Sequence, residues 1–305
     1  MEKTHAVYIN PLTDFGFKFL FGQEGNKEFL LSFLNAVMKL DKPITNAEFV
    51  DKEKINENKD GRALIYDLHC KLADGRKVIV EMQNRYQTNF KDRAIYYLSG
   101  DIYHQGMKGS DWDYKLTPVY GIFLMNFDWR EGEEEHLRED VCLMNIRNKE
   151  IFSDKFSMTF LKIPMMMKDA ENCRDTLERW LYILKNMEKM EAIPKAFMKD
   201  PVFRRLGEVA RVAVLNKQER SEYEKSLKIY RDNYAIFMTE RTEGFAEGEA
   251  KGRAEGRAEG RAEGRAEEEE FIVRRMTSKG MSPSEIAEMT GYSIDAIENI
   301  LNAGQ

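Results

Sequence analysis

The sequence predicts an α/β protein with a mixed central sheet flanked by helices, followed by a helical region and a short helix-turn-helix-like tail. The first observation is that residues 1–165 mix strand and helix patterns, in the order helix, hairpin, helix, strand, strand. The second is that the pattern becomes helical from about Asp169. The third is a low-complexity tract after Glu243, which leads into a compact tail. We therefore expect four segments: 1–168, 169–242, 243–270 and 271–305.

Composition limits the classes of protein to consider. The chain has 305 residues, 42% of them hydrophobic, enough for one sizeable core with helical additions. No apolar run approaches the roughly 20 residues of a membrane span, and the first residues lack the apolar stretch of a secretory signal. Cys70, Cys142 and Cys173 show no metal-ligand spacing, so we expect reduced thiols, a cytoplasmic protein and no membrane partner. The net charge of −6 means that any nucleic-acid binding must come from a local patch.

Each predicted element has its own signal. NKEFLLSFLNAVM predicts an amphipathic helix near 26–40, ended by Asp41 and Pro43. RALIYDLHCKL and KVIVEMQ, separated by ADGR, predict a β-hairpin. TPVYGIFLMNF and DKFSMTFLKIP predict two further strands. Residues 90–107 predict a helix, and four of its residues would face inward: Ile95, Leu98, Ile102 and Tyr103. In the helical region one face is apolar: Leu177, Trp180, Leu181 and Leu184.

The hairpin alternates cleanly. Its first arm has an apolar row, Leu64, Tyr66, Leu68, Cys70 and Leu72. The opposite face of that arm carries Asp67, His69 and Lys71. On the second arm Val78, Val80 and Met82 are apolar, and the other face carries Lys77, Ile79, Glu81 and Gln83.

Two loops could join these arms. A two-residue Asp74-Gly75 turn would set Asp67 opposite Met82 and mix the faces. A three-residue loop with Gly75 in the left-handed conformation sets Asp67 opposite Glu81. It also pairs Leu68 with Val80, Tyr66 with Met82, and Cys70 with Val78. Because a one-residue slip would turn a whole apolar row toward the wrong face, the pattern favours the three-residue loop.

Asp67, Glu81 and Gln83 then share one face at the end of the hairpin. Opposed Cβ atoms lie about 4.5–5.5 Å apart, and two carboxylates at that distance repel unless a cation lies between them. Two carboxylates and a carbonyl oxygen are ligands suited to Mg²⁺ or Mn²⁺, which support phosphoryl displacement. The alternative is a solvated surface in which Arg85 or Arg93 forms the ion pairs.

A basic and aromatic stretch follows the hairpin. Arg85, Lys91 and Arg93 could contact a phosphate backbone. Tyr86 and Phe90 interleave with them, and aromatic faces beside cations suit a nucleic-acid groove. The stretch predicts a DNA-binding patch made of Arg85, Tyr86, Lys91 and Arg93.

Three stretches resemble a known family: NPLTDFGFKFLFG, DLHCKLADGRKVIVEMQ and QNRYQTNFKDRAIYYLSG. They resemble the PD-(D/E)XK nuclease superfamily and, more narrowly, its recombination-promoting nuclease (Rpn) and transposase family, over about the first 165 residues and more loosely beyond. The resemblance implies a restriction-endonuclease-like core in residues 1–168. It also implies a Mg²⁺-dependent DNA endonuclease that promotes recombination or acts in mobile-element biology. Asp67 and Glu81 would hold the metal, and Gln83 stands where the superfamily normally has lysine.

That departure leaves a second function open. Lysine can orient water and offset developing negative charge, whereas an amide can only hydrogen-bond. The alternative is a catalytically weak or inactive DNA-binding or regulatory protein. Asp14 and Lys18, four residues apart, offer a third carboxylate and a replacement ammonium if their segment is helical, or else pair with each other. His69 is expected to shape the site, not to act as a base.

The tract after Glu243 repeats Glu-Gly-Arg-Ala. On a helix, residues four apart stack, so each Glu ridge and each Arg ridge repels itself, and Gly costs about 1 kcal/mol relative to Ala. We expect a helix that is stable only on association, giving a homodimer, with a flexible linker as the alternative. The tail fits a helix-turn-helix with Gly291 at the turn. Asp295 and Glu298 lie on its second helix, which favours protein contact over DNA contact.

Overall fold

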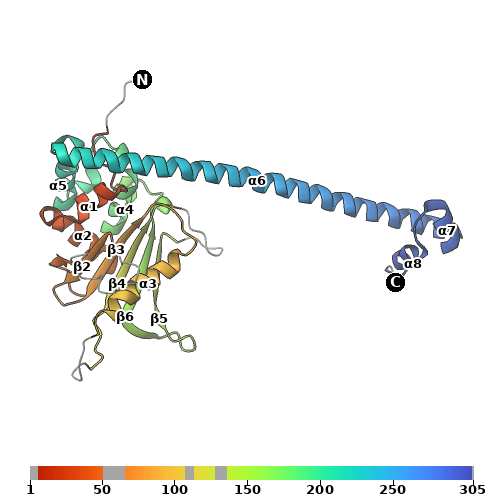
Figure 1. The fold of residues 1–305 in the computed structure, drawn as a ribbon, viewed down its shortest axis with the longest axis horizontal. Coiled ribbons are helices and arrows are strands. Elements are labelled where there is room, and N and C mark those ends of the chain that lie inside the picture. The colour runs from red at the N-terminus through yellow and green to blue at the C-terminus, as the bar shows by residue number, and fades with distance from the viewer. Residues whose placement is uncertain (1–5, 51–65, 107–112, 128–135, 304–305) are drawn as a thin grey trace, which may run out of the picture. The chain divides into compact units, whose positions relative to one another are not determined.

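The computed structural model describes residues 6–50, 66–106, 113–127 and 136–303 (Figure 1). The first part of the chain forms a mixed sheet with helices on its faces. The helices of this part are α1 (Asp14–Phe21), α2 (Lys27–Met38), α3 (Phe90–Tyr103), α4 (Thr176–Asn186) and α5 (Pro201–Val209). The strands are β1 (Ala47–Phe49), β2 (Leu68–Leu72), β3 (Lys77–Gln83), β4 (Val119–Met125), β5 (Arg138–Met144) and β6 (Ile151–Lys162). The predicted fold class is confirmed.

Within the described residues the sheet has six strands in the order β1-β2-β3-β4-β6-β5. β3, β4 and β6 are parallel neighbours, while β1, β2 and β5 join by antiparallel pairing. α3 connects β3 to β4, as a parallel pair requires a crossover. The carboxyl ends of β3 and β4 therefore lie at one edge of the sheet, where the chain after Gln83 begins.

The predicted hairpin register is confirmed. Leu68 pairs with Val80 and Cys70 with Val78. The N–H of Leu72 donates to the carbonyl of Arg76 at 2.8 Å, which leaves a three-residue loop, and Gly75 has a φ of +88°. A left-handed φ strains any residue with a side chain, so glycine suits this position.

Two hydrophobic cores lie on the two faces of the sheet. On one face the apolar rows of β2 and β3 pack with α1, α2, α4 and α5, around the fully buried Trp180. On the other face α3 packs over Ile79, Phe123 and Phe160 (Figure 1). Ile79 faces α3, so Glu81 and Gln83, which alternate with it along β3, lie on the α3 face, while Asp67 lies at the end of the hairpin, just before β2.

Tyr66 departs from the predicted row. Its predicted pairing with Met82 is wrong, because the β2–β3 ladder begins at Leu68. The chain bends at Asp67, so the Tyr66 ring lies in the core under α3, where it contacts the rings of His69 and Tyr97 edge-on. Leu64, predicted in the same row, lies outside the described residues.

The predicted inward face of α3 is only partly right. Leu98 is buried, but Ile95 is 47% exposed and Tyr103 is 74% exposed, while Ile102 is half-buried. The residues that face the sheet are Phe90, Ala94, Leu98 and Asp101. The helix is rotated from the predicted position because two strand residues, His69 and Lys77, hold the carboxylate of Asp101.

Two edge strands, β1 and β5, were not predicted. β1 is three residues long, too short for a period to show. β5 carries Arg138, Glu139 and Asp140 at its start and is mostly exposed, as expected for an edge strand that pairs only with β6. Elsewhere the predictions hold, with α2, β4 and β6 at the expected places and the four apolar residues predicted for one face of α4 all buried.

A long helix, α6 (Lys217–Thr277), follows, and contacts divide the chain into two units after Tyr234. In the first unit, α6 is held to the core by hydrogen bonds. The N–H of Asn10 donates to the Tyr223 hydroxyl at 2.9 Å, and the N–H of Phe15 donates to Oγ of Ser226 at 3.1 Å. No helix in the described ranges is both long and apolar enough to cross a membrane.

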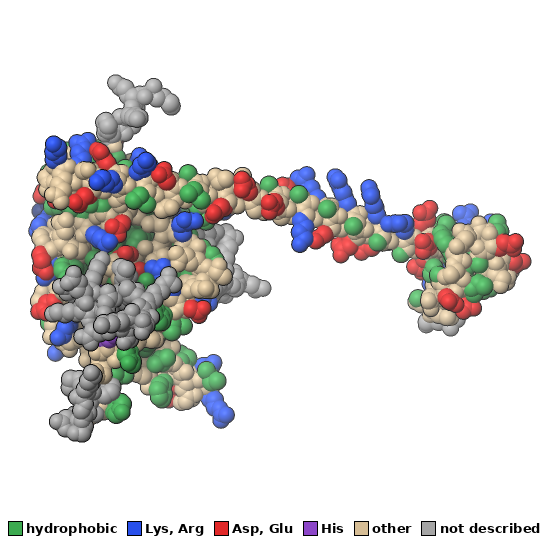
Figure 2. All heavy atoms as spheres, viewed as in Figure 1, with side chains coloured by type: hydrophobic (Ala, Val, Ile, Leu, Met, Phe, Trp, Pro, Cys, Tyr) green, Lys and Arg blue, Asp and Glu red, His purple; other side chains and the backbone are tan. Residues whose placement is uncertain are grey.

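The second unit contains the repeat and the tail. The repeat is helical, its side chains are exposed, and nothing lies within 4 Å of a Cβ built at Gly252, Gly256 or Gly260. Basic side chains gather mainly along one side of this stretch and acidic ones along the other (Figure 2). Helices α7 (Pro283–Thr290) and α8 (Ile294–Asn302) pack on the end of α6 through Val273, Ile286 and Ile297. Gly291 caps α7 with a φ of +77°, as predicted for the turn.

Candidate active site

Asp67 and Glu81 meet at the open end of the β2–β3 hairpin. Asp67 directly precedes β2, and Glu81 lies opposite it in β3. The N–H of Asp67 donates to Oε1 of Glu81 at 3.0 Å, and the N–H of Met82 donates to Oδ2 of Asp67 at 2.8 Å. Beyond the last backbone pair of the ladder, these two N–H groups therefore donate to side-chain carboxylates instead of backbone carbonyls. The two hydrogen bonds fix the direction of both side chains.

Glu81 is buried, with 2% of its surface exposed. Burial, and after it the charge of Asp67, raises the pKa of Glu81 to about 8. The hydrogen bond from Asp67 N–H, the charge of Arg93 and the amide of Gln83 act in the opposite direction. Burial is the larger of the two raising causes, so the raised pKa reflects mainly the removal of Glu81 from water and only then the charge of Asp67.

Gln83 and Arg93 both approach the same oxygen of Glu81. Nε2 of Gln83 lies 3.3 Å from Oε2, and Nη2 of Arg93 lies 3.6 Å from it. Arg93 comes from the first turn of α3, where it also donates to the Tyr97 hydroxyl at 3.1 Å and to Oε1 of Gln87 at 3.0 Å. A guanidinium therefore stands beside the position at which the superfamily normally has lysine.

Asp14 lies near Asp67, and Lys18 lies on the same face of α1. Segment 14–21 is helical, capped by Thr13, whose side chain accepts from the N–H of Gly16. Asp14 and Lys18 form an ion pair, with side chains 65% and 39% exposed. Asp14 and Asp67 line one small cavity of about 70 Å³, together with Leu12, Phe17, Met82 and Asn84. The structure thus brings the third carboxylate, Asp14, next to Asp67, with Lys18 as its partner.

The rest of the predicted DNA-binding patch lies around this edge of the sheet. Arg85 is half-buried just past β3, Tyr86 is 50% exposed with its ring edge-on to Phe127, and Lys91 is exposed on α3. The fourth residue of the patch, Arg93, directs its guanidinium at Glu81.

Two polar networks were missed by sequence reasoning. Nδ2 of Asn126 donates to Oδ1 of Asn84 at 3.1 Å and to the Tyr230 hydroxyl at 3.2 Å, which ties the ends of β3 and β4 to α6. Beneath α3, Asp101 accepts from Lys77 at 2.9 Å and lies 2.8 Å from Nε2 of His69. His69 is buried there, consistent with shaping the site. In the sequence, the signal for the network around Asp101 was the polar face of the hairpin, which carries His69 and Lys77.

The donor set fits a hard divalent cation. Two preoriented carboxylates, one with its pKa raised, and an adjacent amide oxygen are the ligand types such ions take. No group of three His, Cys, Asp or Glu side chains in the described ranges is arranged to hold a metal. Mg²⁺ commonly takes one or two carboxylates together with waters and substrate phosphates.

Comparison with protein families gives one match. The model of the PD-(D/E)XK nuclease family transposases matches residues 11–240, which includes the whole hairpin site and the start of α6. The chain belongs to the PD-(D/E)XK nuclease family of transposases. No curated protein and no solved structure matches the chain. Membership supports a nuclease- and transposase-related function of the hydrolase class in general, and nucleases of this superfamily generally use divalent metal ions.

Proposed function

We propose that this PD-(D/E)XK protein is a metal-dependent DNA endonuclease that promotes recombination or acts in mobile-element biology. The observation that carries the proposal is the pairing of Asp67 with Glu81, two carboxylates at the open end of the hairpin, with Gln83 beside Glu81. Mg²⁺ is the proposed ion, with Mn²⁺ as a substitute. A cytoplasmic location remains a prediction from the sequence.

Each residue of the site has a role in this proposal. Asp67 and Glu81 would hold the cation. When bound, the cation supplies Lewis-acid chemistry, lowering the pKa of water and neutralising phosphate charge. The amide of Gln83 hydrogen-bonds and orients the attacking water. Asp14, with Lys18 as its partner, adds a third acidic group at the same small cavity.

We further propose that Arg93 supplies the positive charge that lysine supplies in other members of the superfamily. Its guanidinium lies 3.6 Å from the oxygen of Glu81 that Gln83 also contacts. Arginine stays charged at all working pH values, so it offsets developing negative charge without acting as an acid. We propose that the other three residues of the patch contact the DNA backbone beside the site: Arg85, Tyr86 and Lys91.

The test is cleavage of supercoiled plasmid by the full chain with Mg²⁺ or Mn²⁺. We expect nicking, abolished by EDTA, restored by excess metal, and reduced about 100-fold or more in Asp67→Asn, because a metal ligand acts directly on the reacting phosphate. Asp74→Asn is the matched control, since Asp74 lies in the hairpin loop and pairs with Arg76. Metal-independent nicking, or equal loss in both variants, would contradict the proposal.

A second function has a specific observation in its favour. Gln83 occupies the position where the superfamily normally has lysine, and the guanidinium of Arg93 contacts Glu81. A protein with this site could bind DNA with little or no cleavage. Wild-type protein that shifts DNA in a gel but leaves plasmid intact with either metal would favour this regulatory function.

A further inference from the structure

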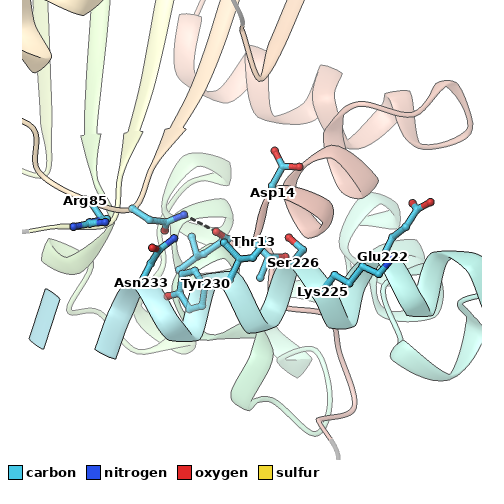
Figure 3. A pocket seen from close by; sticks show the side chains of 11 residues that line it. Thr13, Asp14, Arg85, Glu222, Lys225, Ser226, Tyr230 and Asn233 are labelled. Carbon is cyan, nitrogen blue, oxygen red and sulfur yellow. Dashed lines mark hydrogen bonds between the residues drawn. The ribbon is translucent and has the colours of Figure 1, made fainter. Parts of the chain in front are cut away.

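A larger cavity lies beside the carboxylates. It has a volume of about 480 Å³ and lies between the start of α1, the chain just past β3, and the first turns of α6 (Figure 3). Leu12 and Asp14 line it from the first element, Asn84 and Arg85 from the second. The α6 wall is a single stripe of residues three or four positions apart, from Glu222 to Asn233. All of these residues belong to the first unit of the chain.

This cavity adjoins the catalytic carboxylates. It shares Leu12, Asp14 and Asn84 with the small cavity that Asp67 lines. It also lies outside the carboxyl end of β3, in the sheet whose β3, β4 and β6 are parallel. In open α/β sheets, ligands bind in the crevice outside the carboxyl ends of the strands. A ligand in this cavity would be next to the reacting phosphate.

The walls are held in place by hydrogen bonds. Asn126 donates to both Asn84 and Tyr230, and Nδ2 of Asn84 donates to the carbonyl of Leu12 at 2.7 Å. The Ser226 hydroxyl accepts from the N–H of Phe15 at the start of α1. These bonds join the three elements around the cavity, so the cavity is largely preformed, as ligand sites usually are.

The lining combines an apolar surface with two cations. Leu12, Ile229 and Tyr230 offer apolar and aromatic surface, and Arg85 and Lys225 add positive charge from opposite elements. Of the two carboxylates in the lining, Asp14 forms an ion pair with Lys18, and Glu222 accepts a hydrogen bond from the neutral amide of Gln218. Apolar and aromatic surface beside cations is the combination that binds single-stranded nucleic acid.

We propose that this cavity binds one unpaired nucleotide of the DNA strand next to the scissile phosphate, with its base against Leu12, Ile229 and Tyr230 and its two flanking phosphates near Arg85 and Lys225. The inference rests on the proposed function and names its substrate class. A cavity of 480 Å³ is of small-ligand size and cannot admit a duplex. The protein should therefore prefer single-stranded, flapped or gapped DNA to fully paired DNA.

The first experiment measures binding without cleavage. Fluorescence anisotropy of the full chain in EDTA compares a labelled single-stranded oligonucleotide with a blunt duplex of the same sequence. We expect tighter binding of the single strand. Lys225→Gln should weaken it several-fold and reduce the slope of log K against log salt by about 0.7, the value for one lost single-strand phosphate contact. Lys228→Gln is the control, because Lys228 is exposed on α6 and does not line the cavity.

A second pair of variants tests the apolar wall. Ile229 is 62% exposed and Ile236, one heptad later, is 50% exposed, so neither substitution should prevent folding. Ile229→Asn should weaken single-strand binding, and Ile236→Asn should not. Equal affinity for single strand and duplex, or equal effects within either pair of variants, would overturn the inference.

The two proposals fail in different ways. A protein that binds the single strand through Lys225 and Ile229 but cuts no DNA with Mg²⁺ or Mn²⁺ supports the cavity and overturns the nuclease. A protein that nicks plasmid through Asp67 but is indifferent to the cavity variants supports the nuclease and overturns the cavity.

Discussion

Asp67 lies directly across the hairpin from Glu81, and its N–H donates a 3.0 Å hydrogen bond to the Glu81 side chain. Oδ2 of Asp67 in turn accepts from the N–H of Met82. Both carboxylates are therefore oriented by the backbone before any ligand arrives. The cost of this preorganisation is repulsion between the buried Glu81 and the half-buried Asp67, which a bound cation would relieve.

Removing the charge of Glu81 should stabilise the metal-free protein at high pH. The folded-state pKa, about 8, lies above the ordinary value of 4.5. Stability from this carboxyl is therefore fully present below pH 4.5 and is lost as pH rises through 8. In EDTA at pH 8.5, Glu81→Gln should unfold in urea with a free energy roughly 1–3 kcal/mol above that of wild type.

The same unfolding measurement at a second pH, with Mg²⁺ and with a control variant checks this prediction. At pH 5.5 the difference should shrink, and Mg²⁺ should stabilise wild type but not the variant. Glu191→Gln, at an exposed position, should change neither result. A constant difference between Glu81→Gln and wild type at both pH values would contradict the prediction.

The role proposed for Arg93 can be tested by moving the positive charge from position 93 to position 83. Arg93→Gln should lower the single-turnover cleavage rate about 10–100-fold while DNA affinity stays nearly unchanged, because its guanidinium faces Glu81. Adding Gln83→Lys to that variant should restore much of the rate, since lysine then stands in the superfamily position. If Arg93 instead contacts the DNA backbone, Arg93→Gln will weaken binding and Gln83→Lys will not rescue it.

The hairpin could be predicted from sequence because its information is local. Period-two alternation and one glycine with positive φ decide the register, and the register places Asp67 opposite Glu81. Tyr66 shows where local information ends. The alternation continues through it in the sequence, but the bend at Asp67 sends its ring to the other face.

The rest of the site depends on packing between distant segments. The rotation of α3, which brings Arg93 to Glu81, follows from the buried Asp101 finding partners on β2 and β3. A buried aspartate is not expected from an apolar pattern, so the predicted face of α3 was only partly right. The cavity beside Asp14 needs α6 to return to the start of α1, which no local pattern reveals.

Asp101 should be among the most costly positions to change. Burial opposes its ionisation, but hydrogen bonds from His69 and Lys77 outweigh burial and hold its pKa below the ordinary value. Asp101→Ala would leave Lys77 and His69 without their acceptor, at a cost of roughly 3–5 kcal/mol in urea unfolding. Because the pKa is lowered, this stabilisation should be present near neutral pH and lost as pH falls through the folded-state pKa.

The control for Asp101 lies on the same helix. Asp92→Ala changes an exposed acidic residue of α3 and should cost far less than Asp101→Ala. Similar losses in the two variants would mean that helix propensity, and not the buried ion cluster, dominates the effect.

The glycines of the repeat separate two accounts of α6. Nothing lies within 4 Å of a Cβ at Gly252, Gly256 or Gly260, so alanine fits a lone helix and should favour it by about 1 kcal/mol per position. If two helices associate along the face that carries these glycines, alanine side chains would also block their close approach. We expect the peptide of residues 243–270 to gain helicity with concentration, and the triple alanine variant to be more helical but independent of concentration. Circular dichroism at several concentrations measures both. Concentration-independent spectra for the wild-type peptide would rule out association through the repeat and leave a solitary helix or a flexible linker.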